Sequence, residues 1–302
     1  VAPTCSPVTV AALAAVAVSG AAMAQVTLSG KYAFGFTSDK DNAAVSTTGL
    51  GVTDGHFTLT ATEDLGGGMK LTAKAEMLNR GRGTDISARD ATMTVSGGFG
   101  ALTMGSVSAG NPVNAYAGGN GRDSETTIRA GGNVDLLKYT LPTMVSGLSV
   151  ALSKTDPTGA GTVGAGNTFG VSIGYTTGAL SAGFGITNFK AASTIKSRTT
   201  MGASYDLGMA VVSAGTQTYK YVAAATANKK ETVLGITAPV LANLSVGMTS
   251  RKMSQVGTAN ISSTDLGATY SLSKRTSVNF SSESVKTVGT ALKAQLQRVK
   301  LT

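Results

Sequence analysis

The sequence predicts an all-β fold, a transmembrane antiparallel β-barrel of 16 strands. Three observations lead to this fold. From Gln25 onward apolar and polar residues alternate with a period of two. Short connections between the strands alternate with long ones. Apolar residues are spread thinly and evenly along the chain.

The composition is unusual for a water-soluble domain of this length. Of 302 residues, 42% are hydrophobic and 39 are glycine, whereas histidine and cysteine occur once each and tryptophan is absent. Large aliphatic residues arrive singly, although a soluble core normally requires thicker apolar runs. A membrane barrel needs apolar side chains on its lipid face only, so this supply is sufficient.

Residues 1–24 form a separate region that is typical of a secretory signal peptide. Positions 8–24 are almost all small or apolar, and they end in Ala22-Met23-Ala24, a suitable cleavage site. A buried or membrane-spanning helix is the alternative, but about 17 residues containing Ser19 and Gly20 are short for a span. Because no Lys or Arg precedes the apolar run, we expect the start of the chain to be truncated.

Removal of 1–24 would leave the barrel domain, 25–302, without a thiol. Cys5 is the one cysteine, so disulfides and cysteine metal sites are not expected in the mature chain. No other apolar stretch approaches the length of a transmembrane helix. A closed barrel is the remaining way for such a chain to enter a membrane.

The alternation assigns two faces to each expected strand. Segments 57–62 (FTLTAT) and 70–77 (KLTAKAEM) show the pattern, with apolar residues on one side and Thr, Lys or Glu on the other. The apolar side should face lipid and the polar side should line a water-filled interior. We expect the following to face lipid: Leu59, Ala73, Val95, Val171 and Val246.

Connections of two lengths separate the expected strands. Seven are short, at 65–68, 97–100, 142–147, 176–179, 206–209, 239–242 and 272–275. The longer ones lie at 38–54, 80–88, 109–133, 156–166, 190–196, 221–229 and 254–262, with a last one near 287–289. An even number of strands with short turns at one end and longer loops at the other is typical of outer-membrane barrels.

Tyrosines mark one expected edge of the membrane. Four of them share the apolar face of their strands, and each precedes a short turn by a few residues, as an interfacial aromatic girdle requires. These four are Tyr139, Tyr175, Tyr205 and Tyr270, and the weaker candidates for the opposite girdle are Phe36, Phe189 and Tyr219.

The residues for other kinds of function are missing or badly spaced. His56 is the one histidine, and no carboxylate stands beside it in a hydrolase motif. The run 66–70 (GGGMK) lacks the spacing of a phosphate-binding loop, and the carboxylates lack calcium-loop spacing. Lys and Arg are scattered rather than clustered with aromatics, which argues against nucleic acid. We therefore expect no enzyme activity, cofactor or metal.

Four motifs resemble one family. Residues 62–70 (TEDLGGGMK) are similar to the S/TEDLGGGLK turn of the general porins of neisserial and burkholderial type. Segments 89–105, 137–142 (LKYTLP) and 265–276 (DLGATYSLSKRT) resemble further motifs of these porins in the same order. The similarity spans 25–302. It implies a sixteen-stranded homotrimeric porin of the Gram-negative outer membrane, with an inward-folded loop three, 109–133, as the constriction. The family ends in phenylalanine, so we expect the last residues after Thr302 to be absent from this sequence.

Charged residues on the polar faces are the candidate pore lining. The mature chain keeps the net charge of +9, and basic residues dominate the expected inward set. In a porin, such a wall would concentrate anions. His56 stands where the family often has an inward Arg. The candidates for the pore lining and constriction are Lys31, His56, Lys74, Asp90, Asp123, Glu125, Arg129, Lys138 and Arg298.

Together these patterns predict a general diffusion porin. It would let ions and small hydrophilic solutes cross the outer membrane passively, with a mild preference for anions. Its expected partners are outer-membrane lipid, small anions and hydrophilic solutes, and two further copies of the chain. The alternative is a secreted Gly/Ser/Thr-rich adhesin or structural β-protein, which predicts a fixed short repeat that the sequence does not contain.

Overall fold

The computed structural model describes residues 25–40, 45–79, 81, 86–108, 113, 133–156, 167–190, 193–223, 225–287 and 293–302. The predicted signal peptide, 1–24, lies outside these residues. So does most of the predicted constriction loop, including Asp123, Glu125 and Arg129. The account below concerns the described part of the chain.

The described residues form sixteen strands, as the sequence predicts. In chain order these are β1 (Gln25–Lys40), β2 (Ser46–Gly66), β3 (Met69–Leu78), β4 (Ser87–Gly97), β5 (Gly100–Ser108), β6 (Asn133–Thr140), β7 (Leu148–Asp156), β8 (Thr168–Thr177), β9 (Leu180–Phe189), β10 (Ile195–Asp206), β11 (Val211–Tyr221), β12 (Lys229–Leu241), β13 (Leu244–Gln255), β14 (Ile261–Ser271), β15 (Ser277–Thr287) and β16 (Lys293–Leu301).

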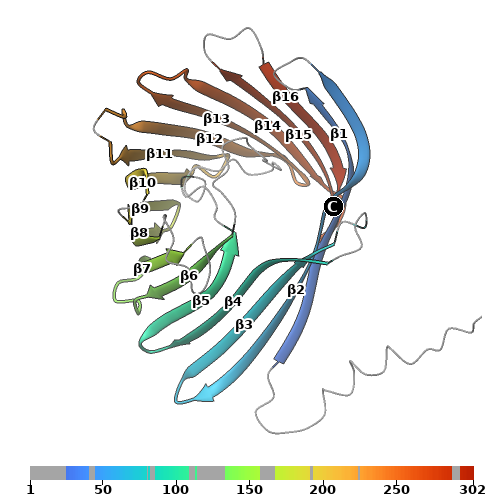
Figure 1. The fold of residues 1–302 in the computed structure, drawn as a ribbon. Helices are drawn as coiled ribbons and strands as arrows, with labels where there is room; N and C mark the ends of the chain where they lie inside the picture. The colour runs from blue at the N-terminus through green and yellow to red at the C-terminus, as the bar shows by residue number, and fades with distance from the viewer. Residues whose placement is uncertain are drawn as a thin grey trace, which may run out of the picture.

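The strands close into one barrel. Each pairs antiparallel with its neighbours in the sequence, and β1 pairs with β16 from Phe34 opposite Leu301 to Lys40 opposite Gln295. Figure 1 shows the ring, with the red β16 beside the blue β1 where it closes. Closure leaves no free strand edge. A β-structure inside a hydrocarbon layer must be closed in this way, because its backbone groups have no water to bind. Among the residues that the structure describes, no helix is long and apolar enough to cross a membrane.

The turn after β2 explains the glycines of the TEDLGGG motif. Gly66, Gly67 and Gly68 have φ values of 77°, 62° and 76°, a region that side chains other than glycine rarely adopt. Asp64 Oδ1 accepts a hydrogen bond of 2.8 Å from the Gly66 amide. The motif therefore builds a tight hairpin between β2 and β3.

The prediction of a first loop at 38–54 is wrong. β1 continues to Lys40 and β2 already begins at Ser46, so most of that segment is strand. A β-bulge interrupts the register between Ala33 and Phe34, where Asp54 and Val52 are the respective partners on β2. The bulge and the Gly/Ser/Thr-rich composition hide the alternation there, because an extra residue reverses the apparent faces beyond it.

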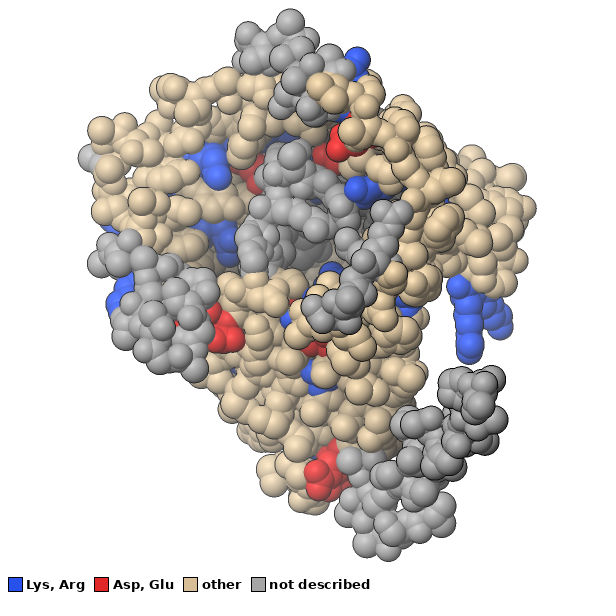
Figure 2. All heavy atoms as spheres, turned by 45° about the vertical axis from the view of Figure 1, so that its right-hand side comes forward, with Lys and Arg blue, Asp and Glu red and all other residues tan. Residues whose placement is uncertain are grey.

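The outer face carries the apolar residues of the predicted lipid side. Leu59, Val171 and Val246 are 38%, 37% and 38% exposed. Ala73 is also exposed and Val95 is half-buried. Figure 2 shows Lys, Arg, Asp and Glu gathered around the opening of the barrel, whereas the outer wall in that view consists mainly of other residues.

The tyrosines near the short turns also lie on the outer face. Tyr175, Tyr205 and Tyr270 are 39%, 47% and 42% exposed, and Tyr139 donates a 2.6 Å hydrogen bond to the Phe99 carbonyl in the turn between β4 and β5. The assignment of Tyr219, one of the three weaker candidates, to the opposite girdle is wrong. It shares the inward face of β11 with the fully buried Gln217, whose Nε2 lies 3.1 Å from the Tyr219 hydroxyl.

Candidate pore-lining site

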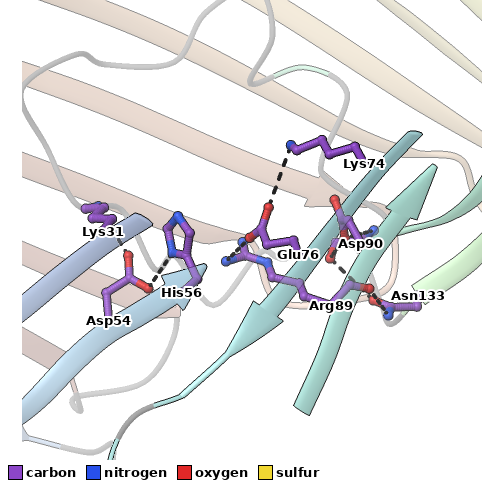
Figure 3. A network of polar contacts seen from close by, with 9 residues as sticks. Lys31, Asp54, His56, Lys74, Glu76, Arg89, Asp90 and Asn133 are labelled. Carbon is purple, nitrogen blue, oxygen red and sulfur yellow. Dashed lines mark hydrogen bonds and ion pairs between the residues drawn. The ribbon is translucent and has the colours of Figure 1, made fainter. Parts of the chain in front are cut away.

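One wall of the interior begins with a carboxylate between two basic side chains. Lys31 on β1 is directly opposite His56 on β2. Lys31 Nζ lies 3.2 Å from Asp54 Oδ2, and His56 Nδ1 lies 3.3 Å from Asp54 Oδ1. Figure 3 shows Lys31 and His56 on either side of the Asp54 carboxylate.

The same arrangement recurs on the next two strands. Glu76 on β3 lies between Lys74 Nζ, at 3.8 Å, and Arg89 Nη1, at 3.2 Å. A register shift between Ala75 and Met77 brings Arg89 of β4 to this position. Each carboxylate therefore has a basic side chain on either side.

The basic side chains of this wall are more exposed than the acidic ones. The side chains of Lys31, Lys74 and Arg89 are 39%, 46% and 41% exposed. Those of Asp54 and Glu76 are 21% and 11% exposed. The carboxylates are thus held closer to the wall, and the cationic groups project farther into the interior.

The two ends of the segment between β5 and β6 are tied to β4. Asp90 Oδ1 accepts hydrogen bonds from the amide and hydroxyl of Ser108, at 2.9 and 2.8 Å. Ser108 ends β5 and is directly opposite Asn133, the first residue of β6. Asn133 Nδ2 donates to the Arg89 carbonyl at 2.9 Å. The root of the predicted loop three is therefore fixed to the same strand that carries Arg89 (Figure 3).

The far wall is built of polar groups that are buried. Glu231 on β12 is 1% exposed, and it accepts a 2.6 Å hydrogen bond from Gln217 of β11 and a 3.4 Å ion-pair contact from Arg251 of β13. Arg251 itself is 1% exposed. Lys229 lies on the same wall, with Nζ 4.4 Å from the centre of the Tyr219 ring.

This buried surface continues toward the closure of the barrel. Asp265 of β14 is directly opposite Glu283 of β15, and both are buried. Arg298 and Lys300 of β16 face inward beside them, opposite Ser281 and Asn279. Arg298 is half-buried and Lys300 is buried. These groups are therefore not an open, water-filled wall like the one at β1 to β4.

A residue of the predicted constriction loop packs on the far wall. Val113 follows β5 in the sequence, and it forms a fully buried apolar pair with Val233 of β12. Val233 is directly opposite Arg251, on the inward face of its strand. At Val113, therefore, the segment between β5 and β6 lies inside the barrel.

The predicted site residues that the structure describes thus divide into three groups. Lys31, His56, Lys74 and Asp90 come together on the wall formed by β1 to β4. Lys138, on β6, is exposed and lies opposite Thr103 and Ser153, with no other predicted residue beside it. Arg298 lies on the more buried side.

The sequence pattern does not predict two residues of this wall. Asp54 lies within the loop expected at 38–54, and Arg89 is not among the expected pore-lining residues. Both lie at or beside a register shift, where simple alternation fails. In the described part of the chain, no group of three or more His, Cys, Asp and Glu side chains could hold a metal ion.

The chain matches the family model described as "Gram-negative porin" over residues 9–290, and it belongs to that family. It is therefore a passive diffusion channel of the bacterial outer membrane. The family and the fold are those of channels rather than enzymes. No curated protein sequence matches the chain.

Solved porin structures share the fold. An anion-selective porin from Comamonas acidovorans has a TM-score of 0.73 and 22% identity, covering 92% of this chain and 99% of that one. The trimer form of OmpT, an outer-membrane protein of Vibrio cholerae, has a TM-score of 0.69 and 13% identity, covering 92% and 98%. A mutant of the Rh. blastica porin has a TM-score of 0.67 and 16% identity, covering 92% and 99%.

Proposed function

We propose that this porin prefers small anions and that the wall formed by β1 to β4 produces the preference. The observation that carries the proposal is the unequal reach of its charges. Lys31, Lys74 and Arg89 are exposed by 39% or more, whereas Asp54 and Glu76 are exposed by 21% or less. A passing ion meets the cationic groups first, and fixed charge in a narrow space concentrates counter-ions.

The preference is mild because each cationic group has a carboxylate within 4 Å. Lys31, Lys74 and Arg89 are balanced by the carboxylates of Asp54, Glu76 and Asp90. The preference therefore rests on the greater exposure of the cationic groups rather than on net charge, and water between the groups screens the field. The Debye length is about 10 Å at 0.1 M salt and about 3 Å at 1 M. Weak sites of this kind also allow the ion to leave, which conduction requires.

The segment 109–133 is proposed as the constriction. The contact of Val113 with the inward Val233 supports this role, because it places one residue of the segment inside the barrel. The hydrogen bonds that Ser108 donates to Asp90 and that Asn133 donates to the Arg89 carbonyl hold both ends of the segment beside the cationic wall. Asp123, Glu125 and Arg129 remain proposed constriction residues within it.

A homotrimer is the proposed assembly. The support is the similarity of the fold to porins of which one is a trimer form. Outer-membrane lipid and small hydrophilic solutes are the other proposed partners, since the exposed apolar face and the charged interior suit them respectively.

The decisive experiment is a reversal-potential measurement on the refolded chain 25–302 in a planar bilayer with a KCl gradient. We expect anion preference at low salt and its decline as ionic strength rises. A preference for potassium at low salt would contradict the proposal.

A further inference from the structure

We propose that the outer face of β11 to β15 carries a binding surface for the phosphorylated headgroups of outer-leaflet glycolipid. The surface consists of four lysines, Lys220, Lys230, Lys252 and Lys286, and we call it the lysine belt. All four are exposed near the loop ends of their strands. This surface lies outside the pore and is separate from the ion-conducting wall.

The strand register places the belt on the outer face. Lys252 and Met248 lie on the same side of β13, since they are four residues apart, and Met248 is 43% exposed. The neighbouring Arg251, on the opposite side, is buried inside the barrel. Lys230 shares its side of β12 with the exposed Leu234 in the same way.

Every lysine of the belt has a hydroxyl side chain directly opposite it on a neighbouring strand. Lys252 lies between Thr232 of β12 and Ser262 of β14, and Ser262 is also opposite Lys286. The remaining pairs are Lys230 with Thr218 and with Ser254, and Lys220 with Ser197. Direct partners on a sheet have Cβ atoms about 5 Å apart, close enough for an ammonium and a hydroxyl to contact one phosphate group.

The belt follows the plane of the membrane. Residues that lie directly opposite one another on successive strands form a row across the sheet. One such row starts at Lys40 on β1, near the end of the barrel that carries the long loops. It passes Gln295 and Ser284 and reaches Leu148 on β7, at the end that carries the short turns. Such rows therefore descend from β16 toward β7. Residues at the same height along the barrel axis must therefore lie closer to the loop end on each strand that comes earlier in the chain.

From Lys252 to Lys220, the lysines shift in that direction. The direct partner of Lys252 on β12 is Thr232, and Lys230 is two residues closer to the loop end. The direct partner of Lys230 on β11 is Thr218, and Lys220 is again two residues closer. The positions of Lys252, Lys230 and Lys220 therefore compensate for the slope of the rows and keep these three lysines at a nearly constant height. Lys286 lies in the same row as Lys252, through Ser262.

The height of the belt matches the headgroups. Exposed apolar residues lie on its turn side, such as Leu234, Met248, Leu266 and Phe280 with exposures of 56%, 43%, 49% and 43%. The loop ends of an outer-membrane barrel face the cell exterior. Lysines just beyond an apolar band extend their ammonium groups to the interface, and basic clusters there attract anionic lipid headgroups.

Charge favours lipid over a second copy of the chain as the occupant. Four like charges within five neighbouring strands would repel an equally basic surface, whereas the phosphates of the outer leaflet neutralise them. Within the described part of the chain, none of the four lysines forms an ion pair. Their charge is thus available to a ligand outside the barrel.

The test compares two triple variants of the refolded chain in detergent. The belt variant is Lys230→Gln, Lys252→Gln and Lys286→Gln. The control, Lys70→Gln, Lys274→Gln and Arg275→Gln, removes the same charge from exposed residues at the turn end. Native mass spectrometry with bisphosphorylated lipid A, and with the same lipid after removal of both phosphates, measures the bound lipid.

We expect the wild type and the control to retain the phosphorylated lipid in preference to the dephosphorylated one. The belt variant should bind it more weakly, on the order of fivefold for each lysine removed. Equal binding by the belt and control variants would overturn the proposal. So would a belt variant that keeps lipid but loses its oligomeric state, because the surface would then be a subunit interface. Reversal potentials of both variants test the pore separately, so failure of anion selectivity would leave this result intact.

Discussion

The carboxylate of Asp90 accepts two hydrogen bonds from Ser108, one from its amide at 2.9 Å and one from its hydroxyl at 2.8 Å. Asp90 belongs to β4, and Ser108 is the last residue of β5. The contact fixes the point from which the chain leaves the barrel wall toward Val113. It connects a sequence-predicted pore residue to the position of the proposed constriction.

Substitution of Asp90 should loosen this root. Asp90→Ala removes both hydrogen bonds, and we expect a loss of about 1 kcal/mol in the free energy of unfolding together with larger fluctuations of single-channel current. Ser108→Ala removes one bond and should have a smaller effect. Asp135→Ala, on β6, is the control. If Asp90→Ala and Asp135→Ala gave equally quiet channels, the Asp90 contact would have no role in holding the loop.

Charge changes on the wall formed by β1 to β4 should move selectivity in opposite directions. Lys31→Gln with Lys74→Gln should reduce anion preference, because two of the three exposed cations lose their charge. Asp54→Asn with Glu76→Gln should increase it. Reversal potentials at low salt measure both shifts, and Lys154→Gln, on β7, serves as the control. Shifts of the same sign in both double variants would contradict the proposed role of this wall.

The buried pair of Glu231 and Arg251 should be sensitive to loss of one partner. Arg251→Ala leaves Glu231, which is 1% exposed, without its 3.4 Å cationic neighbour. We expect a loss of about 3–5 kcal/mol in denaturant unfolding. Replacement of both residues, with Glu231→Gln and Arg251→Met, should cost less than the sum of the single substitutions. Additive losses would show that the two side chains are energetically independent.

A disulfide should form between the proposed constriction loop and the far wall. Val113→Cys with Val233→Cys places two thiols at a buried contact, and residues 25–302 contain no native cysteine. We expect oxidation to link them and to leave conductance nearly unchanged, as shown by proteolysis followed by non-reducing electrophoresis. Val113→Cys with Val171→Cys, the latter on the outer face, should remain unlinked. Failure of the first pair to oxidise would place Val113 away from β12.

A positive charge introduced at two adjacent residues of β2 should have different effects on stability. Leu59 is 38% exposed on the outer face, whereas Thr60 is directly opposite the inward Lys74. Leu59→Arg near mid-depth should destabilise the folded barrel in lipid by about 2–4 kcal/mol. Thr60→Arg should cost far less because water reaches the interior. Urea titration in lipid vesicles measures both. A larger cost at Thr60 would reverse the two faces of the strand.

The number of strands, their two faces and the turn motif of 62–70 could be predicted from the sequence because they depend on local properties. Side chains of a strand alternate by geometry, and glycines permit the positive φ of a tight turn. Leu59, Val171 and Val246 therefore lie on the expected face. The inward direction of Lys31, His56 and Lys74 follows from the same alternation.

Only the tertiary structure decided which of these charges meet. Asp54 and Arg89 reach Lys31 and Glu76 through irregularities in strand register, and a bulge of one residue is invisible in the alternation beside it. The burial of Glu231, and the contact of Val113 with Val233, depend on segments far apart in the sequence that meet when the barrel closes. Period-two alternation specifies the face of a residue, whereas register and closure specify its neighbours.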